Sequence, residues 1–169
     1  MKRAAGLGLL ALAVSLGAAA ADARPRQRPG GPAGAGSANP SALVAMELAF
    51  NRMAQDKGQW TAFREFADED AVMFVPQAVK ARDWLKGRGD PAQAVTWQPY
   101  QVWMSCDGTL GVTKGAWQRP NGTVGYFTTI WRKQGKPGKN GEYLWVLDQG
   151  DVLPEPLPEP DFLSASVAD

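Results

Sequence analysis

The sequence predicts an α+β domain in which helices come first and a sheet follows. Two observations carry this prediction. Apolar residues recur at helical spacing near residue 50, as Leu43, Met46, Phe50 and Met53. Aromatic and β-branched residues, which suit strands, then dominate the stretch 124–152. This order is typical of a domain whose helices gather on one side of an antiparallel sheet.

Two helices and a helical turn are expected. The first begins at Asn39 and Pro40, because asparagine is a good N-cap and proline suits the first helical position. Gly58 is expected to end it. A second helix, from about Trp60 to Ala67, buries aromatic side chains, and residues 81–86 form a helical turn or two.

Three strands are expected before the last third of the domain. Residues 71–75 form a short apolar strand, and 95–104 form a longer one. Pro99 interrupts the second, which predicts an edge strand or a bulge. The third strand, 110–118, contains two glycines that indicate bending or close backbone approach, and an Asn-Gly turn at 121–122 follows it.

The stretch 124–152 organises the rest of the domain as one long antiparallel hairpin. A basic, glycine-rich loop at 135–141 separates its two strands. Alternation along the first strand creates two faces, and neither face is purely polar, so both are expected to be at least partly covered. One face carries Val124, Tyr126, Thr128 and Ile130; the other carries Phe127, Thr129 and Trp131.

The N-terminal region predicts export. Lys2 and Arg3 precede an uncharged Ala/Leu/Gly-rich segment, and residues 1–23 are identified as a secretory signal cleaved after Ala23. The apolar part is short for a membrane span, so we expect no stable membrane insertion after cleavage. The segment 24–40 is a disordered Pro/Gly/Arg linker. A periplasmic or secreted location follows.

The folded domain is expected over 41–152, and the acidic, proline-rich segment 153–169 is expected to be an extended, mobile tail. The chain carries 18 basic and 17 acidic side chains, a balance that argues against nucleic-acid binding. It has no histidine, which excludes histidine-based triads, dyads and metal sites. We expect no cofactor and no metal. The single cysteine, Cys106, leaves no internal disulfide.

Two carboxylates are candidate catalytic groups. Asp148 follows an apolar strand segment, so it is either a buried acid with a raised pKa or a solvated strand-end residue with a structural hydrogen bond. Glu47 lies beside Met46 on the first helix and reaches either a pocket or solvent. The acidic run 68–70 is expected to be a solvated turn, because adjacent side chains diverge.

Aromatic residues supply the candidate ligand-binding set. Seven tryptophans in 169 residues are enough to fill a core and also to line a cavity. The sequence does not decide between a pocket wall and plain core for these positions. The candidates are Phe50, Trp84, Trp103, Tyr126 and Thr128.

The order of elements resembles the NTF2-like superfamily, in its SnoaL-like and DUF4440-like branches. The resemblance covers 41–151 and rests on Glu47–Pro76, Gly125–Gln134 and Gly141–Asp151. It implies a cone: a curved antiparallel sheet capped by two to three N-terminal helices, with a pocket between them. The steroid-isomerase branch has a catalytic aspartate just before the proline that ends the first strand, and here that residue is Val75.

These features leave two main functions and a weaker third. The first is an exported module that binds a small apolar molecule in the cone or acts as a dimerisation module, forming a homodimer through the outer sheet face. The second is a SnoaL-like isomerase, dehydratase or hydrolase with Asp148 or Glu47 as base. The third is an interaction scaffold that uses the acidic tail. The fold alone does not choose between them.

Overall fold

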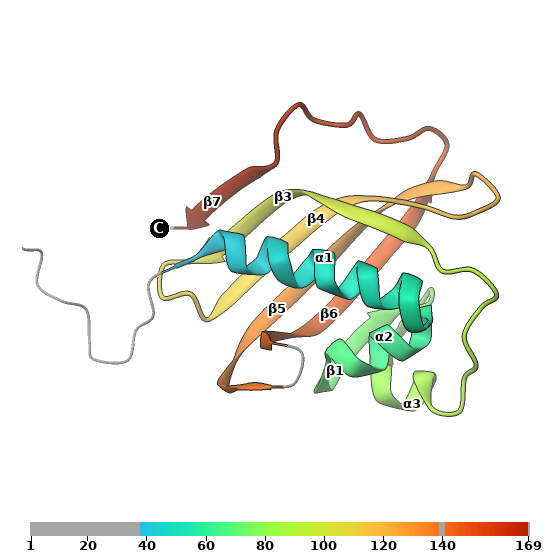
Figure 1. Ribbon diagram of the computed structural model, residues 1–169, viewed down its shortest axis with the longest axis horizontal. Coiled ribbons are helices and arrows are strands. Elements are labelled where there is room, and N and C mark those ends of the chain that lie inside the picture. The colour runs from blue at the N-terminus through green and yellow to red at the C-terminus, as the bar shows by residue number, and fades with distance from the viewer. Residues whose placement is uncertain (1–37, 139–140, 169) are drawn as a thin grey trace, which may run out of the picture. The chain divides into compact units, whose positions relative to one another are not determined.

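The computed structural model describes residues 38–138 and 141–168 (Figure 1). The predicted signal segment 1–23 and most of the linker 24–40 lie outside the described residues. Within the described ranges, no helix is long and apolar enough to cross a membrane.

The described part of the chain contains three helices, and they form where the sequence predicts them: α1 (Pro40–Lys57), α2 (Gln59–Phe66) and α3 (Ala81–Leu85). Gly58 is the single residue between α1 and α2. Its φ of 110° lies in the region that favours glycine, and a Cβ there would lie 2.3 Å from the Asp90 carboxyl carbon. The sharp corner between the two helices therefore requires glycine.

Within the described residues, seven strands form one curved, unclosed sheet in the order β2-β1-β6-β5-β4-β3-β7. Most neighbours are antiparallel, but β1 pairs with β6 and β3 pairs with β7 in parallel. The α+β class is therefore confirmed, and the expected antiparallel sheet is corrected to a mixed one. The strands are β1 (Ala67–Phe74), β2 (Ala78–Lys80), β3 (Thr96–Ser105), β4 (Leu110–Gln118), β5 (Val124–Gly138), β6 (Gly141–Leu153) and β7 (Ser164–Ala168).

The predicted hairpin is the centre of this sheet. Strands β5 and β6 pair from Val124 opposite Leu153 to Gly138 opposite Gly141. Strand β4 joins β5 without a break, while β3 and β4 change register just after Pro99, which confirms the bulge. Gly115 lies beneath this bulge, and a Cβ there would lie 2.0 Å from the carbonyl oxygen of Gln98.

Helix α1 crosses one side of the sheet, which we call the inner face (Figure 1). Phe50 of α1 is the centre of the core that forms between them. Its ring centroid lies 4.8 Å from that of Phe63 in α2 and 4.9 Å from that of Trp97 in β3. Trp131 and Trp145, opposite each other on β5 and β6, are completely buried below.

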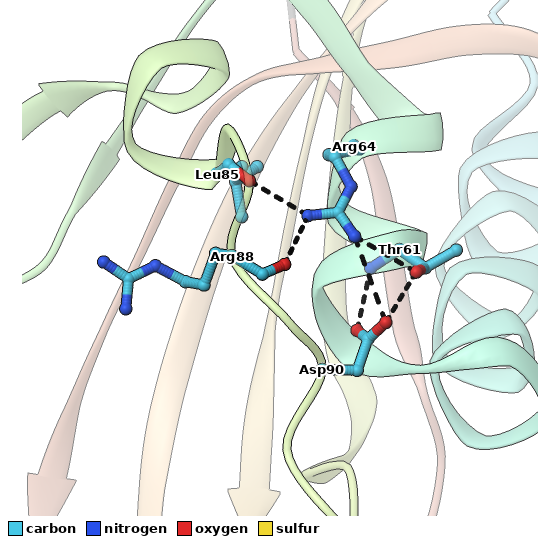
Figure 2. Close-up of polar contacts among 5 residues, drawn as sticks. All are labelled: Thr61, Arg64, Leu85, Arg88 and Asp90. Atoms are coloured by element: carbon cyan, nitrogen blue, oxygen red, sulfur yellow. Dashed lines mark hydrogen bonds and ion pairs between the residues drawn. The ribbon is translucent and has the colours of Figure 1, made fainter.

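A polar cluster fastens the loop after α3 to α2 (Figure 2). Asp90 accepts hydrogen bonds from the backbone nitrogen and the hydroxyl of Thr61, at 2.9 and 2.6 Å. It thereby caps an N-terminus whose own N-cap, Gly58, has no side chain. Arg64 donates to the carbonyl oxygens of Leu85 and Arg88, both at 3.0 Å. The loop is therefore held against α2 at two points, by Thr61 and by Arg64.

Two further expectations, about the segments 68–70 and 153–169, are wrong in the structure. The run 68–70 belongs to β1 instead of forming a turn. Asp68 within it is buried, and Arg132 on β5 pairs with it at 2.7 Å. The tail is not a free extension either, because β7 adds to the exposed edge of β3.

Candidate functional site

A cavity of about 170 Å³ lies between the helices and the inner face. Helix α2, the end of β1, the start of β3 and residues 148–150 of β6 surround it. Apolar side chains form most of its walls, and seven of them carry aromatic rings, so the space is largely apolar. These rings belong to Phe50, Trp60, Phe63, Phe74, Trp97, Trp117 and Phe127.

Asp148 places a carboxylate in this apolar space. The hydroxyl of Thr129, its cross-strand neighbour on β5, donates to Oδ2 at 2.9 Å. Burial raises the pKa of Asp148 from 3.8 to about 6, and the hydrogen bond from Thr129 opposes that rise. Asp148 is therefore an acid that titrates close to neutral pH.

A bulge in β6 explains why Asp148 faces inward. Trp131 pairs with Trp145, whereas Ile130 pairs with Leu147, so Val146 is an extra residue in the ladder. Without it, residues 145 and 148 would point to opposite faces, because they are three positions apart. With it, the buried ring of Trp145 and the carboxylate both reach the inner face.

Glu47 is the second carboxylate with a raised pKa, and it is completely buried in the core, outside the cavity lining. The expectation that it reaches a pocket or solvent is therefore wrong. It accepts hydrogen bonds from Trp97 Nε1 at 2.6 Å, Thr113 Oγ1 at 2.5 Å and Trp131 Nε1 at 3.2 Å. Burial raises its pKa from 4.5 to about 7 although these three donors oppose the rise, and the charge of Asp148 adds to the rise. Glu47 therefore ties α1 to three strands.

The two acids belong to one polar row across the sheet. Thr113 on β4 pairs with Thr129 on β5, which pairs with Asp148 on β6. The hydroxyl of Thr113 contacts Glu47 and lies 3.5 Å from the carbonyl oxygen of Thr129. Only the Asp148 end of this row opens into the cavity, so only that carboxylate can touch a bound molecule.

The structure brings together some of the predicted site residues and separates others. Phe50 and Asp148 line the cavity, and so does Val75. Trp84 packs edge-on against Trp60, with 5.1 Å between ring centroids, outside the lining.

Three predicted ligand-binding residues are not in the lining. Tyr126 and Thr128 alternate with the inward-facing Phe127 and Thr129, so they point to the outer face. Trp103 alternates with the buried Val102 and Met104 and is 38% exposed. The expected pocket wall at these positions is therefore corrected to the opposite side of the sheet.

Sequence reasoning missed most of the wall. Trp97, Trp117 and Phe127 come from three different strands, and Trp60 and Phe63 come from α2. The alternation on β5 did separate Phe127 and its neighbours from Tyr126, but it could not say which set α1 covers. Among the described residues, no group of three or more Cys, Asp or Glu side chains is placed to hold a metal ion.

A curved sheet with helices packed across one face, and a cavity between the two, defines the NTF2-like fold. The chain has this fold. No protein-family model and no curated protein sequence matches the chain.

Solved structures do match. A Parabacteroides distasonis protein, provisionally assigned as a ketosteroid isomerase, aligns over 70% of this chain and 96% of its own, with a TM-score of 0.51 and 14% identity. The CaMKII hub of S. rosetta aligns over 75% of this chain and 100% of its own, with a TM-score of 0.50 and 16% identity. An NTF2-like protein of unknown function from Shewanella baltica aligns over 68% of this chain and 94% of its own, with a TM-score of 0.48 and 13% identity. At these identities the likeness concerns the fold alone.

Proposed function

We propose that this chain is an exported binding protein whose cavity holds a single-ring, largely apolar molecule. The observation that carries the proposal is the aromatic cavity of about 170 Å³. A dry engineered cavity of about 150 Å³ accepts benzene, whereas sites for drug-sized ligands span roughly 300–1,000 Å³. The size therefore favours one ring over a fused-ring ligand. Export rests on the predicted signal 1–23.

Binding is favoured over catalysis by the set of groups that a ligand can reach. Asp148 and Arg119 are the charged side chains in the lining, and the chain has no histidine. Glu47, the other acid with a strongly raised pKa, is completely buried behind the wall. A convergent acid–base pair, which most proton-transfer mechanisms use, is therefore not assembled in this cavity.

The test is an NMR titration of the full chain with toluene and benzyl alcohol. We expect saturable binding that Val75→Trp abolishes, because the larger ring fills the space that Val75 borders. Val79→Trp is the matched control, since Val79 is also half-buried but does not line the cavity. Failure of both probes to bind the unaltered chain, or equal binding by Val75→Trp, would refute the proposal.

One observation favours a second function, general-base catalysis on a bound single-ring substrate. The pKa of Asp148, raised to about 6, suits a base that works near neutral pH. An accessible probe is the conversion of cyclohex-3-enone to cyclohex-2-enone, which needs one proton removed and one returned. Turnover that Asp148→Asn abolishes would support catalysis; a rate equal to that of buffer would exclude this reaction.

We also propose that two copies associate through the outer face. Cross-strand neighbours form an apolar row there, from Trp103 through Val112 and Ile130 to Leu147. All four are half-buried or exposed in the single chain. Analytical ultracentrifugation should show a dimer that Ile130→Asp dissociates; a monomer at all concentrations would contradict it.

A further inference from the structure

Asp148 has one carboxylate oxygen that receives no hydrogen bond from the described residues, and this observation supports an inference that rests on the proposed binding function. Thr129 donates to Oδ2, but within the described part of the chain no group donates to Oδ1. Asp148 is half-buried in the cavity wall, and a carboxylate that has lost part of its contact with water gains from pairing with a cation or a further donor, because leaving water is costly for a charge. A ligand that enters the cavity meets this free oxygen.

Among the described residues, no lysine or arginine forms an ion pair with Asp148. Arg119, the other charged residue in the lining, makes no ion pair with it, and its guanidinium lies 5.2 Å from the Trp117 ring centroid. Strand register explains the separation. Arg119 follows Gln118, which pairs with Val124, whereas Asp148 pairs with Thr129, five residues further along β5. Arg119 therefore lies at one end of the cavity, well away from the carboxylate.

The walls around Asp148 also suit a positive charge. Seven aromatic residues line the cavity, and three of them are tryptophans. The faces of aromatic rings are electron-rich and attract ammonium groups, with tryptophan the strongest of the three aromatic types. An apolar cavity with one unneutralised carboxylate and many ring faces is complementary to a molecule that is both cyclic and cationic.

We propose that the cavity binds a small single-ring amine in its protonated form, with the ammonium group on Asp148 and the ring among the aromatic walls. The ammonium supplies the donor that Oδ1 lacks, and the ring occupies the apolar volume. Neutral rings of the same size bind the same walls but leave the carboxylate unpaired. Anionic rings meet charge repulsion at Asp148.

The test compares benzylamine with benzyl alcohol, two probes of nearly equal size, by isothermal titration calorimetry with the full chain at pH 7. We expect benzylamine to bind at least about tenfold more tightly, since hydrogen bonds to charged groups exceed neutral ones in strength. Asp148→Asn should remove this preference and retain benzyl alcohol. Asp151→Asn is the matched control, because it removes the same charge from an exposed position on the same strand.

The outcomes separate this inference from the proposed function. Equal affinity for the two probes would overturn the amine assignment and leave a single-ring binding site standing. If neither benzylamine nor benzyl alcohol binds, both the amine assignment and the proposed binding function are overturned. A preference for benzylamine that persists in Asp148→Asn would also overturn the inference, because a group other than Asp148 would then bind the ammonium. If Asp148→Asn does not fold, the comparison of the two probes on the unaltered chain decides the question.

Discussion

Two carboxylates with raised pKa values, Glu47 and Asp148, predict that this protein is more stable at pH 5 than at pH 8. Glu47 has a pKa of about 7 in the folded chain, against 4.5 without the fold. A raised pKa means that the folded state holds the proton more tightly than the unfolded state does. The resulting stability is fully present below pH 4.5 and is lost as the pH rises through about 7.

The magnitude follows from the same two values. At 1.36 kcal/mol per pH unit, the rise of the Glu47 pKa corresponds to about 3 kcal/mol, a large share of the roughly 5–15 kcal/mol that stabilises a typical domain. Asp148 acts in the same direction between pH 3.8 and about 6. The two acids interact, so their effects do not simply add.

Histidine titration does not contribute to the change in stability between pH 5 and 8, because the chain contains no histidine. Three aspartates with lowered pKa values also contribute, but their stabilisation is lost only as the pH falls below about 4. These are Asp68, Asp90 and Asp107.

Urea unfolding at pH 5, 6, 7 and 8 measures the effect directly. The free energy of unfolding should fall by about 3 kcal/mol across the series. Glu47→Gln should flatten most of this slope, because the amide keeps an acceptor for Trp97 and carries no charge. Glu155→Gln, at an exposed position, should leave the slope unchanged. A stability that is constant or rises with pH would refute the assignment of Glu47 as a buried, titrating acid.

Three further predictions concern packing, and urea unfolding measures all of them. Gly115→Ala should destabilise the fold by about 1–3 kcal/mol, because the new Cβ would meet the carbonyl oxygen of Gln98; full stability would show that the bulge adjusts. Trp131→Phe should lower the free energy of unfolding by about 1–3 kcal/mol more than Trp145→Phe does. The Trp131 indole donates to two buried oxygens, whereas the Trp145 indole has no hydrogen-bond partner in the described chain. Equal losses in the two variants would contradict this. Asp90→Ala should cost about 1 kcal/mol by uncapping α2, and an unchanged stability would show that the cap is dispensable.

Much of the fold was predictable because the signals are local. The helical stripe around Phe50, the glycine at residue 58 and the proline in β3 each determine their own neighbourhood. The corrected segments depend on distant partners. Asp68 lies in a strand because β1 pairs with β6 and because Arg132 on β5 forms an ion pair with its carboxylate. Strand β7 pairs with β3 after a long, proline-rich connection. Local pattern carries no information about either partner.

The site was harder to predict than the fold for a related reason. Asp148 was recognised as a candidate, but its direction depends on the extra residue at Val146, and a one-residue insertion reverses the face of everything beyond it. The same uncertainty put Tyr126 and Thr128 in the pocket wall. The side chain of Glu47 on α1 shows which face the helix covers, because its three hydrogen-bond donors lie on β3, β4 and β5. The sequence does not show that these residues are its partners.

Strand β7 has a consequence for how the chain matures. Strand β3 is synthesised long before β7, and until β7 arrives its outer edge offers a row of unpaired backbone groups to any neighbouring chain. At the other end of the sheet β2 is only three residues long, so the β3 edge is the principal place where unfinished molecules could join edge to edge. Residues 164–168 therefore protect this part of the β3 edge: a chain that has them pairs residues 101–105 of β3 internally, and a chain that lacks them leaves these backbone groups open to pairing with another chain.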